Sequence, residues 1–211
     1  MEAESQSTEE GGRRTEAGGP GRERAGEDGA LMRGVQAGDE AALGALMERW
    51  ELPVKGLIAR IVLNAREAEE LAQETFVRVW QQRDKFRADA AFRPWVFAIA
   101  VNLARNRLRW WRRRPEVALE EWSGGPGTEE GGRKTENGGG ALGLEAAERS
   151  AAVREAIAAL PVELREAIVL FEYEQLSHAE IAVAVGATPK AVETRIYRAR
   201  EKLRGALKQW A

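Results

Sequence analysis

The sequence predicts an all-α protein made of two small helical domains joined by a flexible linker, with a helix-turn-helix in the C-terminal domain. Apolar residues recur at i, i+3, i+4 and i+7 in two separate blocks, and the β-branched residues follow this helical spacing rather than the alternation typical of strands. Between the blocks, residues 123–140 hold eight glycines and a proline, which predicts a flexible segment. The expected parts are a disordered tail over 1–29, a domain over 30–114, a linker over 115–144 and a domain over 145–211.

Composition excludes several kinds of site. The 211 residues include no cysteine and one histidine, His178. A disulfide, a thiolate nucleophile and cysteine-bound zinc are therefore excluded, and a His-rich metal site or serine–histidine triad is disfavoured. We expect no catalytic residue, no metal and no cofactor. No apolar run approaches the ~18 residues that cross a bilayer, which predicts a soluble, cytoplasmic protein without membrane insertion.

The net charge of −2 conceals an uneven distribution of charge. The acidic residues gather in the tail and the linker, whereas the basic residues gather on two helices. Residues 1–29 are almost free of apolar side chains, so burial cannot offset the entropy lost on ordering. We therefore expect this tail to be disordered.

The first domain is expected to consist of amphipathic helices. Pro53 is expected to start a second helix, because proline fits the first helical position, and Pro94 suits the first turn of a later one. The four expected apolar stripes are Leu43, Leu46, Met47 and Trp50; Val54, Leu57, Ile58, Ile61 and Val62; Ala68, Leu71, Ala72, Thr75, Phe76 and Val79; and Val96, Ile99, Ala100, Leu103 and Trp110.

The last of these helices ends in a basic aromatic stretch, RNRLRWWRRR, over Arg105–Arg114. Its six arginines predict contact with a phosphate backbone. Trp110 is expected in the core and Trp111 at the edge of the apolar stripe. The side opposite that stripe carries Asn102, Arg105, Asn106, Arg109, Arg112 and Arg113.

The second domain contains the most informative stretch of the chain, Leu176–Leu203. Ser177 and Glu180 form a capping box, and Gly186 is placed to end that helix. Thr188 then caps a new helix whose first residue is Pro189. A short helix, a glycine turn and a second helix predict a helix-turn-helix.

The outer face of the second of these helices is expected to carry the base-reading residues. Val192, Ile196, Ala199 and Leu203 form the buried side. In a helix-turn-helix the opposite face enters the major groove, whereas in an ordinary bundle it is only a solvated charged surface. The capped turn and the excess of basic residues favour DNA binding. The outward residues are Lys190, Glu193, Thr194, Tyr197 and Arg198.

Three stretches together resemble the extracytoplasmic-function (group 4) sigma factors of bacterial RNA polymerase. AEELAQETFVRVW (Ala68–Trp80) is similar to their core-polymerase-binding helix, and KFRADAAFRPWVFAIAVNLARNRLR (Lys85–Arg109) to their promoter-melting segment. Leu160–Arg204 is similar to their −35-reading domain. The three stretches follow the order and spacing of the family.

The resemblance implies roles for particular residues. Glu70, Leu71, Gln73 and Glu74 would meet the clamp helices of the polymerase β′ subunit. The −10 element would be met by Phe86, Phe92, Trp95, Asn102, Arg105, Asn106 and Arg109, with the loop from Phe86 to Phe92 capturing a flipped base. The −35 element would be read by Lys190, Glu193, Thr194, Tyr197 and Arg198. Glu193 departs from the family pattern, because many members carry a basic residue there.

The resemblance also implies partners. These are the bacterial core RNA polymerase, through its β′ clamp and β flap, promoter DNA and an anti-sigma factor. The linker begins at Pro115 with the acidic PEVALEEW. The family likeness implies that this segment threads the basic polymerase channel, whereas its composition is equally that of a simple tether.

Two other functions are considered. A stand-alone helix-turn-helix regulator would account for the C-terminal domain, but not for the acidic outer face of Ala68–Trp80 or the second basic helix. An enzyme would need a cluster of catalytic side chains, and the sequence offers none.

Overall fold

The computed structural model describes residues 20–87, 89–114 and 141–210. In these ranges every regular element is helical, which confirms the all-α prediction. Residues 1–19 of the expected tail and most of the expected linker lie outside the described residues. The N-terminal unit comprises α1 (Pro20–Gln36), α2 (Glu40–Val62), α3 (Ala65–Gln81), the 3-10 turn η1 (Arg83–Lys85) and α4 (Phe92–Arg113). The C-terminal unit comprises α6 (Ala141–Ala158), α7 (Val162–Glu172), α8 (His178–Val185), α9 (Pro189–Ala206) and η2 (Lys208–Trp210).

Helix α1 corrects the expected extent of the disordered tail, because residues 20–29 belong to it. Asp28 is buried and accepts hydrogen bonds from Arg49 Nη1 (2.8 Å) and Trp50 Nε1 (3.1 Å), both on α2. Met32 and Val35 are fully buried behind it. Tertiary contacts thus stabilise a helix in residues whose composition alone does not predict one.

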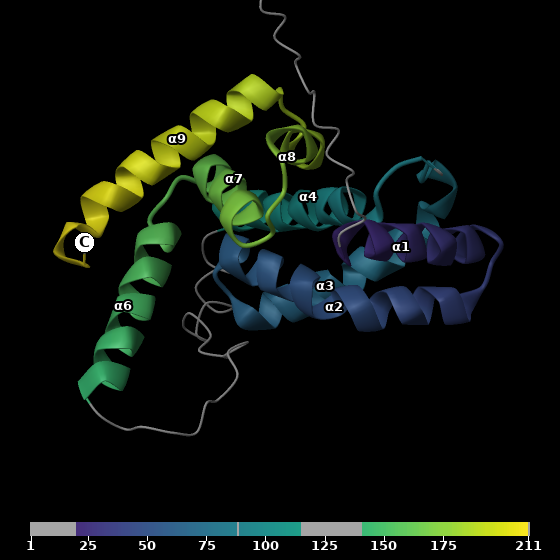
Figure 1. Cartoon of the computed structure of the whole chain (residues 1–211), viewed down its shortest axis with the longest axis horizontal. Coiled ribbons are helices and arrows are strands. Elements are labelled where there is room, and N and C mark those ends of the chain that lie inside the picture. Colours follow the sequence, from purple (N-terminus) through teal and green to yellow (C-terminus); the bar gives the residue numbers. More distant parts are fainter. Residues whose placement is uncertain (1–19, 88, 115–140, 211) are drawn as a thin grey trace, which may run out of the picture.

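The connections between α1, α2 and α3 are short and capped. Gly38 turns the chain at a φ of 88°, and Asp39 then caps α2 by accepting from the backbone N–H groups of Ala41 and Ala42. Leu63 ends α2 in the left-handed conformation, and Asn64 caps α3 at once. These two tight turns place α1 alongside α2 and α2 alongside α3 (Figure 1).

Pro53 does not start a second helix, because α2 runs without a break through it. Proline removes one backbone donor, which normally kinks or ends a helix. Leu46 before Pro53 and Val54 and Leu57 after it are buried in the same core, so packing on both sides favours a continuous helix.

The core stripe of α4 is rotated relative to the prediction. Phe97, Val101 and Ala104 are fully buried, Trp111 is 7% exposed and Trp110 is only partly buried. The roles expected for the two tryptophans are therefore reversed. The reason is that α4 is covered on two sides, by α2 and α3 of its own unit and by α8 of the other.

The two units pack against each other rather than standing apart. Helix α8 lies against α4, and α7 against α2 (Figure 1). The buried apolar residues of both units belong to one continuous cluster. Arg165 of α7 donates from Nη1 to the carbonyl of Ile61 at 2.7 Å, across the boundary. Helix α6 begins at Ala141, inside the range expected for the linker.

Candidate nucleic-acid interface

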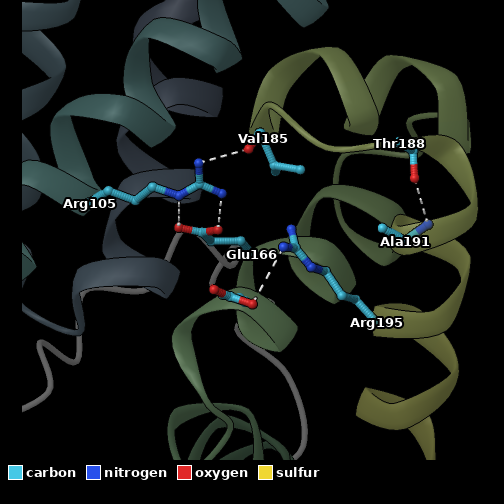
Figure 2. Close-up of polar contacts among 7 residues, drawn as sticks. Arg105, Glu166, Val185, Thr188, Ala191 and Arg195 are labelled. Atoms are coloured by element: carbon cyan, nitrogen blue, oxygen red, sulfur yellow. Dashed lines mark hydrogen bonds and ion pairs between the residues drawn. The ribbon is translucent and has the colours of Figure 1, made fainter.

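The helix-turn-helix of the C-terminal unit is built by three local contacts. Ser177 Oγ accepts from the N–H of Glu180 (3.3 Å), while the Glu180 carboxylate accepts from the N–H of Ser177 (2.8 Å). Gly186 ends α8 with a φ of 65°, the left-handed region that glycine adopts without a Cβ clash. Thr188 Oγ1 accepts from the N–H of Ala191 (3.2 Å), which starts α9 (Figure 2). All three features agree with the sequence prediction.

Helix α9 presents a polar face to solvent. Val192, Ile196 and Ala199 hold its inner side in the core, with Val192 and Ala199 fully buried. All five residues expected to read the −35 element are exposed: Lys190, Glu193, Thr194, Tyr197 and Arg198.

The exposed face of α9 is ordered by hydrogen bonds between its own residues. Lys190 Nζ donates to Glu193 at 2.9 Å, and this bond lowers the pKa of the Glu193 carboxyl. Thr194 Oγ1 donates to the carbonyl of Lys190 at 3.0 Å. Tyr197 is 65% exposed, so its ring and hydroxyl face outward. The face therefore combines donors, an ionised acceptor and a flat aromatic surface.

The side of α4 opposite its predicted apolar stripe, from Asn102 to Arg113, forms a basic strip that is exposed except at Arg105. Asn102, Asn106 and Arg109 are exposed, as are Arg112 and Arg113 beyond them. Arg105 differs, because its side chain is 19% exposed and forms an ion pair with Glu166 of α7. The expectation of an outward Arg105 is thus wrong for this packed arrangement.

The two phenylalanines expected at the −10 element lie in the core. Phe86 is 4% and Phe92 1% exposed. Both form a ring cluster with the partly buried Trp95, in which Phe86 meets Trp95 edge to face with ring centres 5.1 Å apart. Their side chains hold the ends of the intervening loop, which corrects the expectation that the two rings themselves meet a base.

The loop is also held from α1. Gln36 Nε2 donates to the carbonyls of Arg83 (3.0 Å) and Phe86 (2.9 Å). These contacts cross 47 and 50 residues of sequence, so no local pattern could have revealed them.

Helix α3 presents the face expected to bind polymerase. Glu70 and Gln73 are exposed and Glu74 is partly exposed, whereas Leu71 is 5% exposed and packs in the core. Glu70 lies 3.7 Å from Arg66 and Glu74 2.7 Å from Arg78, each an i,i+4 ion pair. Leu71 thus supports this face from inside, which corrects its expected role as a contact.

An open groove separates α3 from α4. Its volume is about 830 Å³. Buried Glu67 pairs with Arg107 across it, an ion pair that the sequence reasoning missed because the two residues lie on different helices. The lining residues are Arg66, Glu67, Glu70, Leu71, Glu74, Arg78, Leu103, Asn106, Arg107 and Trp110. Three residues expected to meet polymerase, Glu70, Leu71 and Glu74, therefore border one groove with Asn106 of α4.

Two further findings bear on function. Over the described ranges, no group of three or more histidine, aspartate or glutamate side chains is arranged to hold a metal ion. Among the same residues, no helix combines the length and the apolar character required to span a membrane.

Known protein families match both units. The model of sigma-70 region 2 matches residues 46–114, and that of sigma-70 region 4 matches residues 150–203. The RNA polymerase sigma-H factor of Pseudomonas aeruginosa is 35% identical over 188 residues, which cover 86% of this chain and 94% of that protein. The chain belongs to the extracytoplasmic-function sigma factors of the sigma-70 family.

Other relatives agree with this assignment. The ECF RNA polymerase sigma-E factor of Escherichia coli K12 is 34% identical over 176 residues, covering 83% of this chain and 92% of that protein. The structure of CnrH in complex with the cytosolic domain of CnrY covers 88% of this sigma factor and 99% of that chain, with 27% identity and a TM-score of 0.63. The sigma factor RpoE of Bartonella quintana, solved with the anti-sigma factor NepR, shares the fold at 21% identity and a TM-score of 0.56.

The two matched regions contain the faces described above. Region 2 includes the α3 face, the groove and the basic strip of α4, and region 4 includes the helix-turn-helix. A stand-alone helix-turn-helix regulator is disfavoured, because that function leaves the region 2 match without a role. As an ECF sigma factor, the protein directs core RNA polymerase to promoters.

Proposed function

We propose that the two units of this sigma factor divide initiation among three surfaces. Glu70, Gln73 and Glu74 of α3 bind the basic clamp helices of the polymerase β′ subunit. This assignment is supported by the positions of the three side chains on the solvent-facing side of α3. Leu71 packs in the core and holds this side of the helix in place. Opposite charge at a solvated surface steers association and fixes orientation.

The −10 element is bound by α4 and the loop before it. Exposed amides and arginines can pair with phosphate oxygens and base edges along one strand. Trp95 is partly buried beside Phe86, and we assign the exposed part of its ring to stacking on a base. The residues assigned to this surface are Trp95, Asn102, Asn106 and Arg109, together with Arg105, which the C-terminal unit covers in the packed arrangement.

The −35 element is read by the outer face of α9 in the major groove. The supporting observation is a capped helix-turn-helix that exposes five polar or aromatic side chains on one face. Lys190 and Arg198 can donate to guanine, whereas the Glu193 carboxylate can accept from cytosine N4.

Other properties follow from the same assignment. The protein acts as a non-catalytic initiation factor in the cytoplasm, and its C-terminal unit meets the β flap of the polymerase. An anti-sigma factor is a further partner: CnrH was solved with the cytosolic domain of CnrY, and the Bartonella sigma factor was solved with the anti-sigma factor NepR.

The observation that carries the proposal is the exposed acidic and amide face of α3, which a DNA-only regulator does not need. Reversing the charge of Glu70 and Glu74, together with Gln73→Ala, is expected to weaken binding to core polymerase by tenfold or more. A tenfold loss of affinity corresponds to about 1.4 kcal/mol of binding free energy. Thermal unfolding is expected to change little, because exposed substitutions cost about 0.5 kcal/mol or less.

A matched control carries Glu145→Lys, Glu148→Lys and Gln209→Ala. These residues are exposed and lie outside both matched regions. Competition for core polymerase should be normal in this variant. Equal competition by the α3 variant and the control would contradict the assigned surface.

A further inference from the structure

Arg105 is engaged by the C-terminal unit with every nitrogen of its guanidinium group. Nε donates to Glu166 Oε1 at 2.7 Å, Nη2 donates to the other carboxylate oxygen, and Nη1 donates to the carbonyl of Val185 at 2.8 Å (Figure 2). Glu166 is fully buried. The centre of the basic strip is therefore occupied by another part of the same chain.

A second arginine contact of the N-terminal unit has the same character. Arg93 donates to the carbonyl of Glu174 and lies 3.8 Å from its carboxylate. Nearby, Arg60 covers the ring of Tyr173 at 4.3 Å. In these contacts the N-terminal unit supplies guanidinium groups, and the C-terminal unit supplies anionic or carbonyl oxygens and a ring face. A phosphodiester offers a guanidinium group paired anionic oxygens in the same way.

We propose that the Arg105 face of α4 has two mutually exclusive partners, the C-terminal unit of its own chain and the phosphate backbone of the −10 strand. The Arg105–Glu166 pair then holds the free protein in a form that cannot use the centre of this face for DNA. The inference rests on the role assigned to α4 above. One guanidinium group cannot place the same three nitrogens on Glu166 and Val185 and on a phosphate.

The pair is suited to being displaced. Burial raises the pKa of the Glu166 carboxyl, and the hydrogen bonds from Arg105 act against this rise. The carboxylate also faces Arg195 of α9 and Glu163 of its own helix. Because desolvation offsets much of the attraction in a buried ion pair, its net advantage is small. A partner that separates the two units can therefore release Arg105.

The experiment measures the distance between the units directly. The chain has no cysteine, so Leu52→Cys on α2 and Val183→Cys on α8 give two unique sites for spin labels. Both positions are highly exposed, at 78% and 71%. Glu166→Arg places a like charge against Arg105 and is expected to lengthen the distance between the labels. The double change Arg105→Glu and Glu166→Arg restores the attraction and is expected to return the distance to that of the parent.

Glu172→Arg is the matched control. It makes the same charge change on the same helix, but Glu172 is exposed and pairs with Arg200 inside the C-terminal unit. Its label distance should equal that of the parent. An unchanged distance in the Glu166→Arg variant, or equal lengthening in both variants, would overturn the proposed contact.

A second readout uses a single-stranded −10 oligonucleotide and the free full-length protein. The Glu166→Arg variant should bind it roughly tenfold or more tightly than the Glu172→Arg variant, because loss of the buried pair releases Arg105. Lengthened distance with equal affinities would show that Arg105 does not meet DNA and would overturn the exclusion. Binding of both variants to core polymerase tests the α3 assignment separately, since that surface does not involve Glu166.

Discussion

Arg198 is exposed on the outer face of α9, one turn beyond Thr194. Replacing it with alanine is expected to cost about 1–3 kcal/mol of promoter binding at one −35 position, because a bidentate base contact contributes that much discrimination. The measurement is holoenzyme affinity for promoters that differ only at that position. Lys202→Ala, also exposed on α9, should weaken binding evenly across sequences. If Arg198→Ala weakens binding equally on every promoter sequence, Arg198 contacts a phosphate rather than a base.

Sequence predicts the exposure of individual side chains better than it predicts their tertiary partners. The exposure of Lys190, Glu193 and Arg198 follows from helical spacing, since each lies opposite a regular apolar stripe. The engagement of Arg105 does not, because Glu166 is 61 residues away and lies on a different helix. Spacing predicts which way a side chain leaves its helix but not what lies there.

Gly186 tests the helix-turn-helix at the scale of the element. Its φ is 65°, and a Cβ added there meets no atom within 4 Å, so the cost of alanine comes from the backbone alone. We expect Gly186→Ala to lower the free energy of unfolding by about 1–2 kcal/mol, measured by urea denaturation. Gly205, inside α9 and equally open, provides the control. Alanine there should stabilise by about 0.5–1 kcal/mol, and destabilisation of equal size at both sites would contradict this account.

Elements with local start and stop signals were predicted well. The capping box at Ser177, the glycine at 186 and the Thr188 cap each depend on residues a few positions apart. Pro53 misled the prediction because burial on both sides outweighs its local preference to begin a helix. Helix α1 was missed because Asp28 is held by Arg49 and Trp50 of α2 rather than by any apolar stripe of its own.

At the scale of the whole molecule, sequence predicts two units but not their packing. Apolar stripes define the helices of each unit, and the resemblance to sigma factors, confirmed by the two family matches, identifies both units as sigma-70 regions. The contact of α8 with α4 includes Arg105, which the sequence places on an outward basic surface, and the contact of α7 with α2 includes Arg165. The packed arrangement places Arg105, on the face assigned to the −10 element, against the unit that carries the face assigned to the −35 element.

This sigma factor directs core polymerase to promoters, and we propose that α9 reads the −35 element. The most direct measurement is run-off transcription by core polymerase from a library randomised at the −35 and −10 elements, with the wild-type protein and with Glu193→Lys. We predict transcripts only when the protein is added. We also predict that the change from an acceptor to a donor shifts the recovered −35 sequences from cytosine towards guanine, with the −10 sequences unchanged. Identical −35 sequences for the two proteins, or transcripts that do not depend on adding either, would contradict the account.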